Sequence, residues 1–231
     1  GRPWLSTIPQ ILFVHKLKSC RKVSDMAQKA FFLDATRCTG CKTCEIACKD
    51  YHDLGVDYTY RRIFDYEGGE WNQASEGVWE NSTFVYHVSV SCNHCDNPAC
   101  TKVCPTGAMH KDSDTGLVSV DADKCIGCGY CAMACPYGAP TVDRDLKHSV
   151  KCDGCASRVA EGKNPICTEA CLLRCLYFGD KDEMAQKGEL AALAPLPDSS
   201  YTEPNLYIRE PHCAKPSGDT SGHVANPKEV E

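Results

Sequence analysis

The sequence lacks the features that mark several common functional classes. No apolar run approaches the roughly 20 residues that a membrane-spanning helix needs, since the longest near the start covers only 11–14. A surplus of positive charge is also missing, because the net charge of −6 argues against a nucleic-acid partner. No phosphate-binding glycine loop, nucleophile motif or H-E-x-x-H metal motif is present. We therefore expect no transmembrane segment in this chain, no nucleic-acid partner and no catalytic residues, and any membrane association must come through another subunit.

Cysteine, in contrast, is abundant, with 19 residues in a chain of 231. A secreted disulfide framework usually has an even cysteine count, a signal peptide and a short chain. This sequence has an odd count, no clear signal peptide and a greater length. Many of its cysteines lie only three positions apart, where a disulfide would be strained. Metal binding explains them better.

Residues 1–25 are basic and largely without pattern, with no small-residue cleavage site and no twin-arginine pair. Met26 opens a stretch that leads directly to Cys38. We interpret Met26 as the natural start and 1–25 as upstream translated or cloning-derived sequence that is not part of the fold. A targeting segment is the alternative.

An internal repeat organises the protein, because sixteen cysteines form four groups of four. Groups one and three share the spacing C-x2-C-x2-C-x3-C, group two has C-x2-C-x4-C-x3-C, and group four widens the middle gap to eleven residues. In sequence order the groups are Cys38, Cys41, Cys44 and Cys48; Cys92, Cys95, Cys100 and Cys104; Cys125, Cys128, Cys131 and Cys135; and Cys152, Cys155, Cys167 and Cys171. Cys20, Cys175 and Cys213 lie outside the groups.

This spacing is typical of bacterial ferredoxins. Three cysteines on a tight loop bind three irons of one cubane, and the fourth, one helical turn later, binds the other cluster of a pair. Gly40 and Gly127 follow the first cysteine of their groups by two positions, where unusual backbone angles are needed. A structural zinc site, the main alternative, usually pairs two C-x2-C knuckles around one ion. We therefore predict four [4Fe–4S] clusters.

The linkers suggest which groups are paired. Only twenty residues join groups two and three, and they include a predicted β-hairpin with an alternating apolar strand at 116–120. Groups one and four must then form the second pair. The predicted ligand sets are Cys92, Cys95 and Cys100 with Cys135; Cys125, Cys128 and Cys131 with Cys104; Cys38, Cys41 and Cys44 with Cys171; and Cys152, Cys155 and Cys167 with Cys48. Proline follows the fourth cysteine in groups two and three, whereas Leu172 takes that place in group four.

The predicted fold class is α+β, with two interlocked bacterial ferredoxin-like cores that hold two clusters each. Core A comprises 26–56 and 137–180, and core B comprises 91–136. A β-rich insertion at 57–90 separates them in the sequence, with strands expected at 58–66 and 83–90. Residues 181–231 are expected to form a helix and an extended tail that contacts a partner, although disorder beyond about residue 195 is an alternative.

Several side chains around the clusters have two interpretations. Packing against the core is favoured for Trp71 and Trp79, and a partner interface is the alternative. His94 is expected to be a neutral neighbour of a cluster or a surface residue, not a ligand. A group of basic residues could offset the cluster charge, although a solvated surface is favoured for most of them: Lys42, Lys49, Lys102, Lys124, Lys151 and Arg158.

The cysteine stretches at 37–44, 91–95, 99–105 and 151–155 resemble a known family. Together with 158–163, 218–222 and 225–230, they resemble the iron–sulfur (B) subunits of anaerobic dimethyl sulfoxide reductases, within the complex iron–sulfur molybdoenzyme family. The resemblance covers about residues 27–231. It is strongest in the tail and in 158–163, because the cysteine groups are shared by the whole family.

The resemblance implies an electron-transfer subunit that is not itself catalytic. Such a subunit lies between a membrane anchor that oxidises quinol and a molybdopterin-containing catalytic subunit that reduces an S- or N-oxide. The complex is expected at the membrane, on the periplasmic face, with the cytoplasmic face as the alternative. Relay subunits of sister enzymes for thiosulfate, polysulfide, tetrathionate, nitrate or formate, and a freestanding polyferredoxin, are the competing functions.

Overall fold

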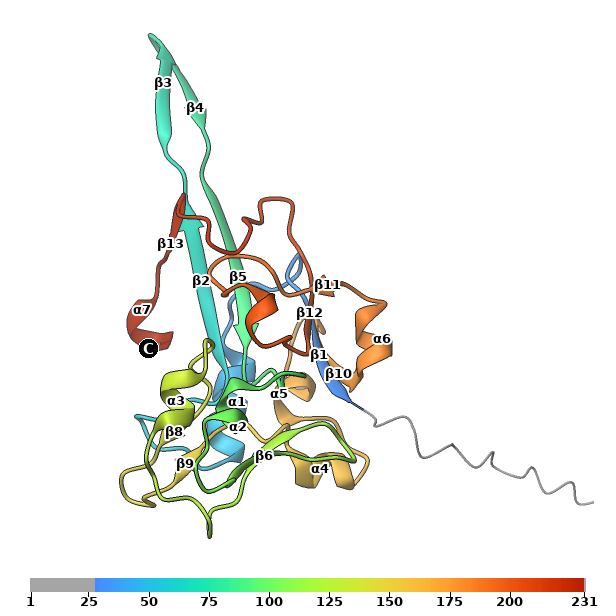
Figure 1. Ribbon diagram of the computed structural model, residues 1–231. Coiled ribbons are helices and arrows are strands. Elements are labelled where there is room, and N and C mark those ends of the chain that lie inside the picture. Colours follow the sequence, from blue (N-terminus) through green and yellow to red (C-terminus); the bar gives the residue numbers. More distant parts are fainter. Residues whose placement is uncertain (1–27, 231) are drawn as a thin grey trace, which may run out of the picture.

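The structure, a computed structural model, describes residues 28–230. The prediction for residues 1–25, the start at Met26 and Cys20 lie outside the described residues. The described part is a mixed α+β protein, as predicted. Figure 1 shows two sheets in its upper part and a cluster of short helices and small hairpins at its lower end.

A four-stranded sheet has the order β10 (Leu176–Asp180), β1 (Lys29–Asp34), β12 (Leu206–Arg209) and β11 (Glu189–Leu190). β1 runs antiparallel to β10 and parallel to β12. Successive side chains of a strand point to opposite faces of its sheet. On one face of this sheet, Phe31, Leu33, Leu206 and Ile208 enter the largest core cluster. The opposite face is covered by helix α6 (Lys181–Ala185), whose Met184 packs on Ala30, Phe32 and Tyr207.

The central place of β12 differs from the expectation for the tail. Leu206, Tyr207 and Ile208 are buried in the protein's own sheet, so this part of the tail is neither disordered nor free to lie on a partner. The short helix η1 (Ser199–Tyr201) precedes β12, and strand β13 (Gly222–Val224) and helix α7 (Pro227–Val230) follow it. The sequence pattern gives little sign that β12 joins the sheet, because this strand is only four residues long.

A three-stranded antiparallel sheet joins β13, β2 (Arg62–Gly68) and β5 (Phe84–Val90). The two strands predicted for the insertion are confirmed as β2 and β5. Asn226 fastens the tail to this sheet, because its side-chain oxygen accepts from the amide of Asp65 at 2.9 Å and its side-chain nitrogen donates to the carbonyl of Ile63 at 2.9 Å.

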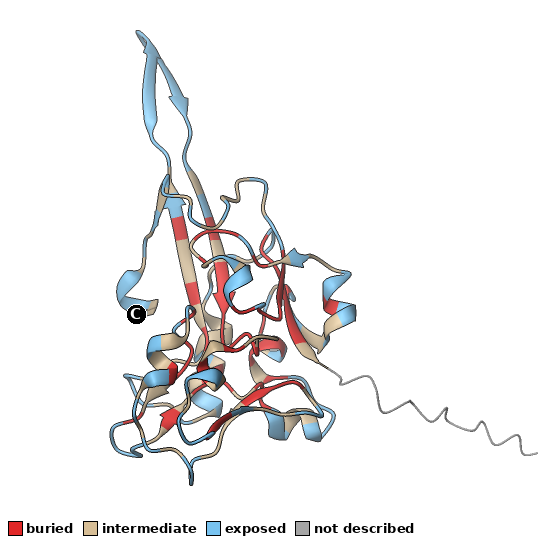
Figure 2. Cartoon of the chain, viewed as in Figure 1, coloured by how far each residue is buried: buried red, intermediate tan, exposed pale blue. Residues whose placement is uncertain are grey.

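Beyond this sheet the chain continues as a narrow hairpin of β3 (Trp71–Ser75) and β4 (Val78–Asn81). The hairpin projects from the body, and every residue of both strands is exposed (Figures 1 and 2). Trp71 and Trp79 are 60% and 57% exposed. The favoured interpretation of these tryptophans as core residues is therefore wrong, because the hairpin extends past any layer on which they could pack.

The cysteine-rich end is built from short elements. Its helices are α1 (Thr43–Tyr51), α2 (Ala99–Lys102), α3 (Tyr130–Ala134), α4 (Ala156–Ala160) and α5 (Ile166–Glu169). The predicted hairpin is confirmed as β6 (Met109–Lys111) paired with β7 (Val118–Val120), and β8 (Thr141–Val142) pairs with β9 (Ser149–Val150). Among the described helices, none has the length and apolar character to cross a membrane.

Two leucines test the structural role of β12. Replacing Leu206, which is 1% exposed, by alanine should lower the free energy of unfolding by about 2–5 kcal/mol, because it leaves a cavity in the core. Leu146 is 60% exposed, so Leu146→Ala should change it by less than about 0.5 kcal/mol. Anaerobic denaturant titrations of the metal-loaded protein would measure both, and equal effects would contradict the placement of β12.

Candidate metal centres

Each cysteine group begins with the same backbone turn. The residue two positions after the first cysteine has a positive φ in all four groups: Gly40 (64°), His94 (44°), Gly127 (64°) and Gly154 (74°). Successive amides in such a left-handed turn point toward one centre and form an anion-binding concavity. At Gly127 a Cβ would also lie 2.6 Å from the carbonyl oxygen of Lys147. The expected role of Gly40 and Gly127 in the backbone turn is thus confirmed.

A helix then spaces the third and fourth cysteines of each group. α1 contains both Cys44 and Cys48, whereas α2, α3 and α5 contain the third cysteine and end within two residues of the fourth. The third and fourth cysteines of a group are therefore about one helical turn apart, and their sulfurs can face different cavities. α1 packs on α5, and α2 packs on α3, so the helices of groups one and four meet, as do those of groups two and three.

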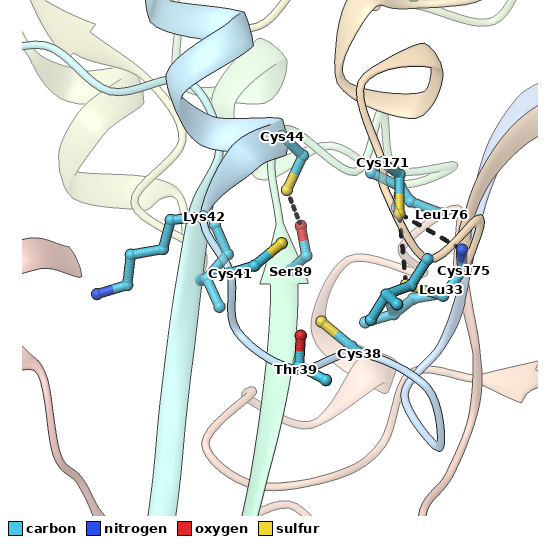
Figure 3. Close-up of a pocket in the computed structure, with 12 residues that line it drawn as sticks. Leu33, Cys38, Thr39, Cys41, Lys42, Cys44, Ser89, Cys171, Cys175 and Leu176 are labelled. Carbon is cyan, nitrogen blue, oxygen red and sulfur yellow. Dashed lines mark hydrogen bonds between the residues drawn. The ribbon is translucent and has the colours of Figure 1, made fainter.

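The first predicted set, here called site I, lines one cavity. Cys38 and Cys41 approach it from the loop before α1, Cys44 from the first turn of α1, and Cys171 from the turn after α5 (Figure 3). The Ser89 hydroxyl lies 3.5 Å from the Cys44 sulfur. The structure therefore brings together four cysteines that are up to 133 positions apart, since 171 − 38 = 133.

Two further sets line cavities of similar size. Site II is formed by Cys92, Cys95, Cys100 and Cys135, and site III by Cys104, Cys125, Cys128 and Cys131. Counting the part that is open to solvent, the space between the atoms at sites I, II and III is about 360, 350 and 330 Å³. Their near equality is what an internal repeat with one kind of occupant would produce.

The remaining set, site IV, consists of Cys48, Cys152, Cys155 and Cys167. All four are buried. Burial raises the pKa of Cys48, and the negative charges of the other three thiolates raise it further. Cys48 thus lies near the three cysteines of group four that the sequence assigned to it.

The donor set of these sites suits a thiolate-bound metal. Within the described part of the protein, no carboxylate or imidazole lines the cavities of sites I to III. Soft thiolate ligands favour iron–sulfur clusters or zinc. Burial raises the pKa of both Cys95 and Cys100 to about 12, so a cation must compensate the charge when these thiols ionise.

His94 connects two of the sites. It is 1% exposed, so its alternative placement at the surface is wrong. Its Nδ1 accepts from the amide of Val118 at 2.9 Å, which leaves the proton of the neutral ring on Nε2. Burial opposes ionisation of Cys152, but the nearby His94 ring lowers the Cys152 pKa, and Nε2 of that ring is buried without a hydrogen-bond partner among the described residues. His94 belongs to group two in the sequence but therefore acts on the sulfur of Cys152 in site IV.

Arg61 is the buried cation of the cysteine-rich region. It is 1% exposed and lies with its guanidinium 4.7 Å from the centre of the Phe31 ring. It donates to the hydroxyl of Ser89 at 3.1 Å and to that of Ser91 at 2.9 Å. Because Ser89 also contacts Cys44, one short network links the guanidinium to site I.

The same guanidinium also faces site IV. Burial opposes its charge, but the negative charges of Cys167, Cys44, Cys152 and Cys48 raise the Arg61 pKa. Burial raises the pKa of Cys167, and Arg61 opposes that rise. A single buried charge thus acts on sulfurs of both sites I and IV.

Most of the basic residues considered from the sequence have other partners. Lys42 lines site I but pairs with Asp65 and Glu229, and Arg158 pairs with Glu169. Lys49 donates to loop carbonyls, Lys102 to Asn97, and Lys124 to Asp121. Lys151 alone of the six is buried, and its charge acts on Cys100 and Cys135 of site II.

Comparison with known proteins agrees with this arrangement. A 4Fe-4S dicluster domain matches residues 83–181, and a 4Fe-4S binding domain matches residues 35–57. The B subunit of anaerobic dimethyl sulfoxide reductase from Escherichia coli (strain K12) is 59% identical over 204 residues, which are 88% of the present protein and 98% of that subunit. The protein belongs to this family of B subunits. The Haemophilus influenzae B subunit is 56% identical over 206 residues, which are 89% of the present protein and 100% of that subunit. The Shigella flexneri B subunit is 58% identical over 204 residues, with coverages of 88% and 98%.

Family membership establishes [4Fe–4S] chemistry and an electron-transfer role in place of a catalytic one.

Two residues near site I were not predicted from the sequence. Arg61 comes directly before β2 and two positions before the buried Ile63, and a charge in phase with an apolar strand face is a usable signal. Cys175 was noted only as lying outside the groups, yet it lines site I.

Neutralising Arg61 should make sites I and IV harder to reduce. Without its positive charge the added electron is less stabilised, so Arg61→Gln should lower both midpoint potentials by about 59 mV or more, a tenfold change for one electron. Redox titration followed by paramagnetic resonance would measure the shift. Arg61→Lys keeps the charge and should restore most of it.

Arg62 provides the matched control. It is the sequence neighbour of Arg61, but it donates to the carbonyl of Gly138 at 2.9 Å in a more exposed environment. Arg62→Gln should leave the potentials of sites I and IV near the wild-type values. A shift as large as that of Arg61→Gln would show that the effect does not depend on the buried position.

Proposed function

We propose that the protein holds four [4Fe–4S] clusters, one in each of sites I to IV, and passes electrons along them. Each site would take three cysteines from one group and the fourth from its partner group, so that sites I and IV form one ferredoxin-like core and sites II and III the other. The observation that supports the proposal is that each of the cavities of sites I to III is lined by three cysteines of one group and the fourth of its partner group, while Cys48 lies near three cysteines of group four.

The contacts between the sites support a row in the order I, IV, II, III. Sites I and IV share the charge of Arg61. Cys92 of site II and Cys152 of site IV lie in one buried cluster. Cys100 of site II and Cys131 of site III lie in another.

The two ends of this row reach the surface. Cys41 of site I and Cys128 of site III are exposed, whereas all four cysteines of site IV are buried. Electron transfer to an outside partner needs a cluster near the surface, and a relay needs one at each end. The exposure of Cys41 and Cys128 therefore favours a relay between two partners over a protein that only stores electrons.

The partners follow from the family. We propose a molybdopterin-containing catalytic subunit at one end and a quinol-oxidising membrane anchor at the other, with dimethyl sulfoxide or a related S- or N-oxide as the terminal acceptor. The protein would then be membrane-associated through its complex, on the periplasmic face. The close identity to B subunits of dimethyl sulfoxide reductases favours this acceptor over those of sister enzymes.

The projecting hairpin of β3 and β4 supports a fixed assembly over a freestanding polyferredoxin. Trp71, Val78 and Trp79 are exposed on it together. Exposed aromatic residues are typical of protein interfaces, and a diffusing carrier has no use for such an extension. We propose that the hairpin contacts one of the partner subunits.

The function can be tested on the intact complex purified from membranes. The protein should co-purify with a molybdenum-containing subunit, and quinol should reduce its clusters. Addition of dimethyl sulfoxide should then reoxidise them within the turnover time of the complex, as seen by paramagnetic resonance. Nitrate and thiosulfate should leave them reduced.

Two results would contradict the proposal. A monomer with all clusters intact and no molybdenum subunit bound would favour a freestanding carrier. Reoxidation by thiosulfate or nitrate, but not by dimethyl sulfoxide, would assign the protein to a sister enzyme.

A further inference from the structure

Site I contains a fifth cysteine. Cys175 is 3% exposed and lines the same cavity as Cys38, Cys41, Cys44 and Cys171. Its sulfur lies 3.5 Å from that of Cys171. Figure 3 shows Cys175 beside Cys171 at the edge of the cavity. A cubane takes one thiolate for each of its four irons, so site I has one thiol more than the cluster requires.

The internal repeat shows that this position faces a cluster in the other sites as well. The residue four positions after the fourth cysteine is Ala139 at site II and Ala108 at site III, and both line their cavities. At site III the backbone also contacts the fourth cysteine, since the amide of Met109 donates to the Cys104 sulfur at 3.3 Å.

Cys175 repeats this geometry at site I. It is four positions after Cys171, and its amide donates to the Cys171 sulfur at 3.4 Å. Where the other two sites present a methyl group, site I therefore presents a thiol. The corresponding residue after Cys48 is His52, whose Nε2 lies 3.5 Å from the Cys155 sulfur of site IV. A polar side chain at this position thus reaches a ligand sulfur in both sites of core A.

The turn between the two cysteines also differs from those of core B. Leu172, which is 70% exposed, follows Cys171 where groups two and three have Pro105 and Pro136. A proline ring fixes φ near −65° and holds the turn in one conformation. Without that ring, the turn after Cys171 lacks this restraint on φ.

We propose that Cys175 is a second ligand for the iron of site I that Cys171 binds. In the resting site the Cys175 thiol would hydrogen-bond to the Cys171 sulfur, from which it lies 3.5 Å away. In the exchange, the iron bond to the Cys171 sulfur breaks and a bond to the Cys175 sulfur forms. The proton of the Cys175 thiol passes to the released Cys171 thiolate, so the oxidation state of the cluster is unchanged. The inference rests on the proposed function, because it requires a cluster in site I.

The test compares single and double variants in the assembled complex. Cys171→Ala should retain the iron content of the wild-type and show no three-iron signal in paramagnetic resonance. Cys171→Ala combined with Cys175→Ala should lose about one iron per protein molecule and show that signal. Cys135→Ala is the matched control, since Ala139 offers no replacement sulfur, and it should lose its fourth iron at site II.

A three-iron signal in Cys171→Ala as strong as that in Cys135→Ala would overturn the inference. If Cys171→Ala does not assemble, Cys175→Ala alone decides. It should keep all four irons of site I but lower the potential of that site alone, because hydrogen bonds to cluster sulfurs raise it. An unchanged potential, or loss of iron in Cys175→Ala, would contradict the resting arrangement. Failure of the cluster assignment on which the inference rests is distinguishable, because the wild-type would then contain no cubane clusters, and the choice of partner or acceptor does not affect these readouts.

Discussion

Ligation of iron by thiolates is the interaction on which the cysteine-rich half of the molecule depends. Its helices are four to nine residues long, and isolated helices of that length are not stable in water. The buried clusters there consist largely of cysteine, as in the group of Cys100, Met109, Val118 and Cys131. Sixteen thiolates without iron would repel one another in these surroundings. With iron, the same sulfurs become covalent links between segments far apart in the sequence, and metal binding contributes directly to folding.

The two sheets have a different basis, because ordinary apolar packing holds them. β1, β10 and β12 share a core of aromatic and aliphatic side chains, and the tail returns along β2 through β13. This rigid half holds the two ends of core A in place, since β1 leads into group one and β10 follows group four. Arg61 lies where the halves meet, against Phe31 on one side and the sulfurs of sites I and IV on the other. A buried cation is costly without partners, and the thiolates of two sites supply them.

The sequence was most informative where spacing alone carries geometry. The C-x2-C-x2-C-x3-C pattern predicted the loop and the helical turn, because one covalent chemistry constrains both, and the short linker between groups two and three predicted how the groups pair. The repeat could not reveal that Cys175 enters site I, because the four ligand positions of the last group were already assigned to Cys152, Cys155, Cys167 and Cys171. The burial of Arg61 was also missed. The adjacent Arg62 is the same residue type but lies in a different environment, so residue type alone does not say which of the two is buried. The tail was hardest to predict, as β12 joins β1 only through tertiary packing and its four residues carry too little periodicity. Trp71 and Trp79 were misplaced because aromatic content suggests burial, whereas the length of the hairpin decides their exposure.

The most direct test of the account is a comparison of three variants that asks which cluster the fourth cysteine of group two serves. Cys104→Ala, Cys128→Ala and Cys100→Ala would each be examined by paramagnetic resonance and redox titration in the intact complex. Because Cys104 lies with group three in the structure, Cys104→Ala should perturb the same cluster signal as Cys128→Ala, while the signal altered by Cys100→Ala stays as in the wild-type. If Cys104→Ala and Cys100→Ala instead changed one common signal, each group would hold its own cluster, and the interlocked arrangement of the sites would be wrong.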